Sequence, residues 1–120
     1  MEVKPIIITD NSTKKEYTLE FSRETVRFAE QRGFRIDDVE AYPMTKVYEL
    51  WFYAFRMHHK ALSKQQTDDL LDKWFGGIGN LPASIMERLG EIYAAPFNAM
   101  ASDEYELDGE GKNGQVTVTL

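Results

Sequence analysis

The sequence predicts an α+β fold in which an N-terminal β-hairpin packs on a bundle of four to five helices, with an extra strand available at the C-terminus. Near the N-terminus, apolar and polar residues alternate as they do in half-buried strands. Over the middle of the chain, apolar residues recur every three or four positions, which is typical of helices with one buried face. A short alternating run closes the chain.

Length and composition predict the domain organisation. A chain of 120 residues is long enough for one hydrophobic core, and we expect a single globular domain over residues 1–102. Residues 103–120 begin with an acidic, glycine-rich stretch that lacks periodicity, so we expect a tail there with a strand-like end.

The overall composition excludes several classes of protein. Apolar residues make up 42% and aromatic residues 12%, which indicates a globular chain. The formal charge of −6 argues against a nucleic-acid binder, and the absence of cysteine excludes disulfides and thiolate metal sites. No secretory signal is evident, and charged residues interrupt the most apolar stretch, residues 45–63, which argues against a membrane span. We therefore expect a cytoplasmic protein with neither a nucleic-acid nor a membrane partner.

The hairpin is expected over residues 5–21. The isoleucine run 6–8 follows Pro5, which is tolerated at the start of a strand, and residues 10–13 have turn chemistry. In the second strand Tyr17, Leu19 and Phe21 alternate with polar residues. Because an isolated two-stranded hairpin is marginally stable, this apolar face must lie on helices or on a further strand.

The first helix is expected over about residues 23–32. Ser22 is its expected N-cap, Glu24 complements the helix dipole in the first turn, and Gly33 is a stop signal. The short connecting segment that follows ends at Pro43.

The central helix is expected over about residues 45–62, with Thr45 as its cap. Its apolar residues cover most of its circumference, so it must be surrounded by protein or by partners. We expect the other elements to pack against it.

Two more helices are expected at about residues 64–75 and 81–101. Ser63 and Gln66 form a capping box at the start of the former, and three glycines between residues 76 and 79 end it. Pro82 fits the first turn of the latter, whereas Pro96 should kink or break it. The final strand pattern, residues 115–120, could add to the N-terminal hairpin or pair with another chain.

No constellation of residues predicts catalysis or metal binding. His58 and His59 are adjacent, so on a helix they cannot jointly hold one metal ion. The glycine loop lacks the lysine and the preceding strand of a phosphate-binding loop. Asp68, Asp69 and Asp72 lack the spacing of a calcium loop and are expected to face solvent. We expect no enzyme activity, no catalytic residue, no metal and no cofactor.

Part of the sequence resembles a family of phage proteins. The strings that carry the resemblance are EYTLEFSRETVRFAEQRGF and PMTKVYELWFYAFRMHHKALSKQQTDDLLD, and it covers about residues 15–100. The chain resembles small proteins of siphophages and prophages that are encoded between the major tail protein and the tape-measure protein. These are regarded as tail assembly chaperones or are uncharacterised. The glycine loop near residues 74–80 and the end at 115–120 depart from the pattern.

The resemblance implies a function in the cytoplasm of a bacterial host. Such a protein would bind the tape-measure protein and the major tail protein during assembly, and could form a homo-oligomer. Binding of this kind needs an apolar groove or an exposed strand edge. The candidate partner-binding residues lie on the central helix, on the last helix and on the terminal strand: Trp51, Phe55, Met86, Tyr93, Phe97, Met100, Val116 and Val118.

Two other functions fit the same residues. The protein could be a structural tail or connector component, which should form a stable ring. It could instead be a small phage or prophage regulator that binds a host protein. A DNA-binding helix-turn-helix around Ser63 is disfavoured, because the acidic second helix would repel phosphate.

Overall fold

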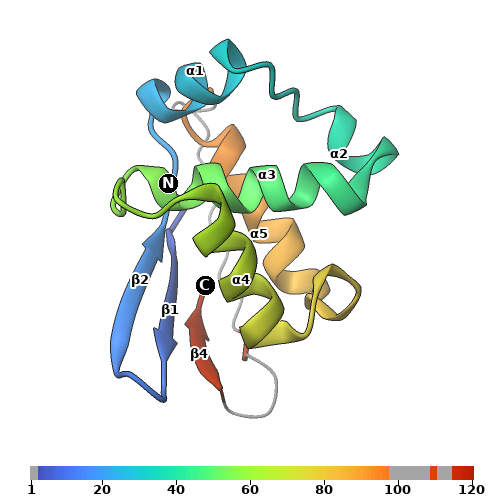
Figure 1. Ribbon diagram of the computed structural model, residues 1–120. Helices are drawn as coiled ribbons and strands as arrows, with labels where there is room; N and C mark the ends of the chain where they lie inside the picture. Colours follow the sequence, from blue (N-terminus) through green and yellow to red (C-terminus); the bar gives the residue numbers. More distant parts are fainter. Residues whose placement is uncertain (1–2, 98–108, 111–114) are drawn as a thin grey trace.

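The α+β fold is confirmed in the computed structural model, which describes residues 3–97, 109–110 and 115–120. An antiparallel sheet lies at one side of a group of helices, and α3 crosses the middle of the molecule (Figure 1). The elements, in chain order, are β1 (Ile6–Asp10), β2 (Lys15–Leu19), α1 (Arg23–Gln31), α2 (Asp38–Ala41), α3 (Pro43–Arg56), α4 (Lys64–Phe75), a 3₁₀ turn (Ile78–Asn80), α5 (Ala83–Ala94), β3 (Gly109–Glu110) and β4 (Val116–Thr119).

The C-terminal strand completes the sheet. The strand order is β2-β1-β4-β3, and every neighbouring pair is antiparallel. Ile8 lies opposite Tyr17 on one side and Val118 on the other, so β1 is an interior strand flanked by segments from the two ends of the chain. Of the two expected arrangements for the terminal strand, addition to the hairpin is the one observed. Residues 116–119 therefore belong to the same sheet as the hairpin, whereas 103–108 and 111–114 lie outside the described residues.

The sheet has one buried face, as the alternating pattern predicts. Along β1 and β4 every second residue is buried, and the side chains between them are more exposed. The buried residues pack against the helices and form one core with them. The sheet contributes to this core Ile6, Ile8, Tyr17, Leu19, Val116, Val118 and Leu120.

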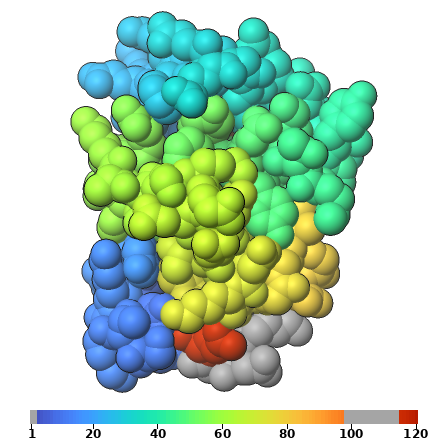
Figure 2. Space-filling model, in the orientation of Figure 1, coloured from blue at the N-terminus to red at the C-terminus, as the bar shows by residue number. Residues whose placement is uncertain are grey.

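Helix α3 is the central element of the core. It contacts β2, α1, α2, α4 and α5, and three of its aromatic side chains, Trp51, Tyr53 and Phe55, are buried. Trp51 is 0% exposed, and its indole N–H donates to the Thr67 carbonyl in α4 at 2.7 Å. In Figure 2, α4 covers the middle of the visible face, which shows why the outer side of α3 is not open to solvent there.

Both ends of α3 differ from the prediction. Pro43 is its first helical residue and Tyr42 its N-cap, so Thr45 is not the cap. A proline is favourable there because the first helical amide has no partner within the helix. At the other end the helix stops at Arg56 instead of residue 62. The sequence between Arg56 and Ser63 contains no glycine or proline that would end the helix. The helix ends where His58 and His59 make contacts with Glu20 and with Thr18 of β2.

The remaining helix ends follow the expected signals more closely. Ser22 and Ser63 both form capping boxes, with Thr25 and Gln66 respectively. Gly76 ends α4 in the left-handed conformation, with φ of 79°. Helix α5 begins after Pro82, its N-cap, and ends at Ala94, shortly before Pro96. It is therefore shorter than the expected 81–101, because a proline cannot donate the next helical hydrogen bond.

Candidate interaction surface

Most of the residues expected to bind a partner lie in the core instead. Because a chain of this size needs its largest apolar side chains to form its own core, the expectation of an exposed contact surface is wrong for five of them. Met86 is half-buried against the core, and Met100 lies outside the described residues. Phe97 is 63% exposed. The five buried residues are Trp51, Phe55, Tyr93, Val116 and Val118.

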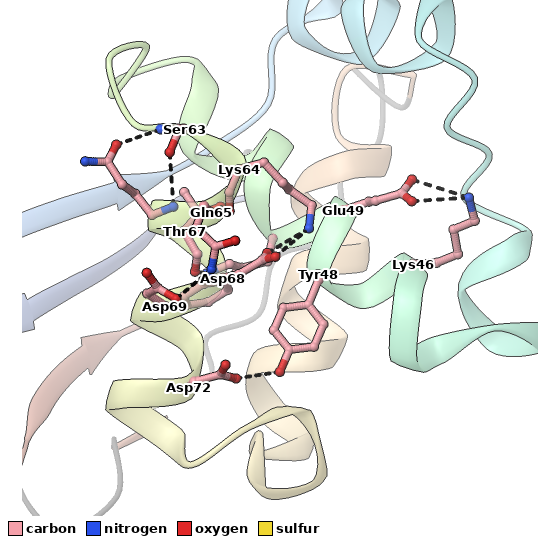
Figure 3. Close-up of polar contacts among 12 residues, drawn as sticks. Lys46, Tyr48, Glu49, Ser63, Lys64, Gln65, Thr67, Asp68, Asp69 and Asp72 are labelled. Carbon is pink, nitrogen blue, oxygen red and sulfur yellow. Dashed lines mark hydrogen bonds and ion pairs between the residues drawn. The ribbon is translucent and has the colours of Figure 1, made fainter.

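The acidic face of α4 is already paired within the protein. Figure 3 shows the ε-ammonium of Lys64 and the amide of Gln65 reaching the carboxylates one turn further on, Asp68 and Asp69, at 2.8 Å and 2.9 Å. The hydroxyl of Tyr48, from α3, donates to Asp72 at 2.5 Å. Burial and this hydrogen bond raise the pKa of Tyr48 to about 12. The contact between Tyr48 and Asp72 joins α4 to α3, and all three carboxylates have partners within the protein.

The two histidines have separate structural contacts with β2 and the residue after it. The backbone N–H of Thr18 donates to Nε2 of His59 at 3.0 Å. The neutral imidazole therefore accepts a hydrogen bond from a backbone amide at the outer edge of the sheet. His58 lies 2.8 Å from the carboxylate of Glu20. Among the residues that the structure describes, no group of three histidine, aspartate or glutamate side chains is placed to hold a metal ion.

Two buried charged residues are structural features that the sequence did not single out. Asp10, 3% exposed, accepts hydrogen bonds from the amide and hydroxyl of Ser12 and from the indole of Trp74. Arg88 of α5 is fully buried, donates to the Lys4 carbonyl at 3.1 Å and pairs with Glu91. These contacts hold the hairpin loop on α4 and the start of β1 on α5.

A groove lies at the opposite end of the molecule from the hairpin loop. It is formed by α1 and by the turn that follows α5, which come together at one end of the molecule in Figure 1, and its volume is about 410 Å³. Its lining combines two arginines and one carboxylate with an apolar floor and wall: Arg23, Val26, Arg27, Glu30, Pro96 and Phe97. Val26 is buried in the core, whereas the Phe97 ring projects from the surface.

The arginines around α1 fall into two groups. Arg32 and Arg56 stack on the Phe28 ring, at 5.2 Å and 3.9 Å from its centre, and Arg35 donates to two backbone carbonyls. In contrast, within the described part of the chain neither Arg23 nor Arg27 makes a hydrogen bond, an ion pair or a ring contact. Both side chains are exposed beside the groove.

One family model matches residues 2–120, and its description is a domain of unknown function, DUF5055. The chain belongs to this family. The match includes the glycine loop and the terminal strand, so both are parts of the DUF5055 domain. No curated protein and no solved structure matches the chain.

Among the described residues of this DUF5055 protein, the groove is where unpaired arginines and an exposed large ring lie together. Sequence reasoning identified Phe97 but missed Arg23 and Arg27. A signal for them was available, because arginines one turn apart at the start of a helix oppose both each other and the helix dipole. Within the described residues, no helix has the length and apolar character needed to cross a membrane.

Proposed function

We propose that the protein is a non-enzymatic tail assembly chaperone of a phage, which binds the tape-measure protein, the major tail protein or both in the cytoplasm of the bacterial host. The resemblance of residues 15–100 to such chaperones suggests the class. The observation that supports binding is the groove beside α1, where the exposed Phe97 ring lies next to two unpaired arginines.

The size of the groove favours a transient complex. A stable protein interface buries roughly 1,600 Å² in total and involves roughly 20–30 residues on each side, whereas six residues line the groove. Further apolar surface is present at the junction of α2 and α3, where Tyr42 is 63% and Met44 71% exposed. Methionine and aromatic side chains adapt to varied apolar partners. An assembly factor must release its client, so modest affinity suits the proposed function.

Co-expression with candidate clients tests the proposal. The tagged protein is produced together with the tape-measure and major tail proteins encoded near its gene, and complexes are isolated by affinity capture and size exclusion. We expect the tape-measure protein to stay soluble only when the DUF5055 protein is present. A Phe97→Ala variant should retain less of the client than a Met57→Ala variant does, because Met57 is an exposed apolar residue outside the groove.

Other results would support the alternatives. A stable ring that remains in finished particles would identify a structural tail or connector component. Capture of one host protein, with no effect on either tail protein, would identify a regulator. Either outcome would overturn the chaperone proposal.

A further inference from the structure

The positions of Arg23 and Arg27 are unfavourable for the isolated chain. Arg23 is the first residue of α1, where the positive end of the helix dipole repels a cation. Arg27 follows one turn later on the same side, so the two guanidinium groups also repel each other. Neither guanidinium forms an ion pair with a described residue, although Glu24 and Glu30 lie on the same helix.

The apolar part of the groove packs against aromatic residues of the core. The Phe97 ring lies 6.1 Å from the ring of Tyr93, which packs in turn against Phe21 and Phe34 in the core. Its exposed face is therefore held in place while the ring stays accessible. The buried Tyr93 hydroxyl has no hydrogen-bond partner in the described structure. Burial and the nearby Glu30 carboxylate raise the pKa of Tyr93 to about 12, so the phenol beside the Phe97 ring stays uncharged.

We propose that this groove binds an acidic amphipathic helix of a partner protein. The inference rests on the proposed function and specifies the chemistry of the client segment. The guanidinium group of arginine can bind a carboxylate through two parallel hydrogen bonds. Beside the arginines, Phe97, Pro96 and Val26 form a surface for one apolar side chain.

The spacing of the charges fits a helix. Residues four apart on α1 rise about 6 Å along its axis, and carboxylates four apart on a helix lying alongside repeat at the same distance. Glu30 lies one further turn along the groove, where it matches a lysine or arginine of the partner. For a partner helix parallel to α1, the expected client segment therefore carries two acidic residues four apart, then a basic residue, beside an apolar stripe.

A nucleic-acid backbone fits this site less well. Glu30 lines the groove and would repel phosphate, as would the acidic chain as a whole. The apolar wall formed by Phe97 would also remain uncovered. Duplex DNA is accordingly a negative control in the test.

Titration calorimetry with synthetic peptides tests the inference on the full chain. The probe is a 15-residue helix-forming peptide with a leucine stripe and one face bearing two glutamates four apart followed by a lysine. In the control peptide the two glutamates are lysines. We expect micromolar binding of the acidic peptide, at least tenfold weaker binding of the control, and weaker binding of the acidic peptide as the salt concentration rises.

Variants locate the binding site. The double variant Arg23→Gln/Arg27→Gln should weaken binding of the acidic peptide at least tenfold, and Phe97→Ala should weaken it about fivefold. The control variant Lys14→Gln/Lys60→Gln also removes two positive charges, but from exposed positions outside the groove. It should change binding less than twofold. Arg27→Glu should restore binding to a peptide in which the facing glutamate is lysine. Circular dichroism checks that each variant is folded.

Several results would overturn the inference. These are equal binding of the two peptides, unchanged affinity in the double arginine variant, or tighter binding of duplex DNA than of the acidic peptide. If the double variant does not fold, the comparison of the two peptides on the unaltered chain still decides. If the double arginine variant still retains the tape-measure protein, only the assignment of the groove as the binding site is refuted. Peptide binding without any tail client would refute only the chaperone function.

Discussion

At the scale of single residues, several polar side chains hold elements together that are far apart in the sequence. The Asp10 carboxylate joins the hairpin loop to Trp74 at the end of α4, and His59 joins the turn after α3 to Thr18 in β2. Both contacts depend on one protonation state, so both predict a dependence of stability on pH.

Asp10 should stabilise the protein only while it is ionised. The hydrogen bonds from Ser12 and Trp74 hold the pKa of Asp10 well below its ordinary value of 3.8. A depressed carboxyl pKa adds stability above the unfolded value, and this stability is lost as the pH falls below about 4. Asp10→Asn should lower the free energy of unfolding at pH 7 by about 2 kcal/mol, because charged hydrogen bonds become neutral ones.

Urea denaturation at pH 7 and pH 3 measures this difference. The gap between the variant and the unaltered protein should narrow at pH 3, where the carboxyl of the unfolded chain is protonated. A constant gap at both values would show that Asp10 acts through its shape alone.

The contribution of His59 to folding stability should decrease as the pH falls, which is opposite to the behaviour of a histidine that is charged and ion-paired in the folded state. Burial, followed by the nearby His58 and Lys15, lowers the pKa of His59 below 6.5, and its neutral Nε2 accepts from Thr18. A histidine with a lowered folded pKa adds stability above its unfolded value, and that stability declines as the pH falls below about 6.5. Since a typical hydrogen bond contributes on the order of 1 kcal/mol, a loss of that size is expected on acidification.

Thermal melts between pH 7.5 and 5 compare the unaltered protein with His59→Gln. Glutamine offers a neutral acceptor that does not titrate, so its melting temperature should change less over this range. His58→Gln is the matched control for the exposed neighbour, which pairs with Glu20. The prediction fails if His58→Gln, and not His59→Gln, removes the dependence near pH 6.

At the scale of elements, local signals and tertiary contacts determine different helix ends. The start of α4 is local, because Ser63 and Gln66 satisfy each other's backbone amides. The end of α3 is not local, because the sequence between Arg56 and Ser63 contains neither glycine nor proline. The chain turns there in a way that allows His58 and His59 to reach β2 and Glu20.

The cap of α4 predicts a stability effect. Ser63→Ala should lower the free energy of unfolding by about 1 kcal/mol, because the Gln66 amide loses its acceptor. Ser63→Asp supplies another favourable cap and should stay within a few tenths of a kcal/mol of the unaltered protein. Urea denaturation followed by circular dichroism makes the comparison. Equal losses in the two variants would show that side-chain packing, and not capping, explains the effect.

At the scale of the whole molecule, the terminal strand makes the fold depend on both ends of the chain. Val118 is buried opposite Ile8, whereas Thr119 on the other face is exposed. Val118→Asp should lower the free energy of unfolding by more than about 3 kcal/mol, because it buries an unpaired charge. Thr119→Asp, its matched control, should change it by less than about 0.5 kcal/mol.

Unfolding followed by tryptophan fluorescence distinguishes one cooperative domain from a domain with a loose tail. Trp51 and Trp74 lie in the same core as Val118. If β4 belongs to that core, Val118→Asp shifts the tryptophan transition itself. An unchanged transition would mean that the terminal strand contributes little to the stability of the domain.

The candidate site could be predicted only in part from the sequence. The Phe97 ring was identified because it belongs to an apolar stripe, yet the same reasoning selected Trp51 and Tyr93, which are buried. An apolar pattern indicates which side chains avoid water, but it does not distinguish the protein's own core from a partner's surface. The groove also joins residues about 70 positions apart, 23–30 and 96–97, and no local pattern places those segments side by side.

By itself, the sequence determined the class of fold, the alternating hairpin, the caps at Ser22 and Ser63 and the helix-breaking effect of Pro96, because each depends on neighbouring residues within one or two turns. Only the tertiary structure decided which strand β4 joins, where α3 ends, which aromatic side chains are buried, and that Arg23, Arg27 and Phe97 border one groove. Those outcomes depend on contacts between distant segments, whose free energies are set by how the whole core closes.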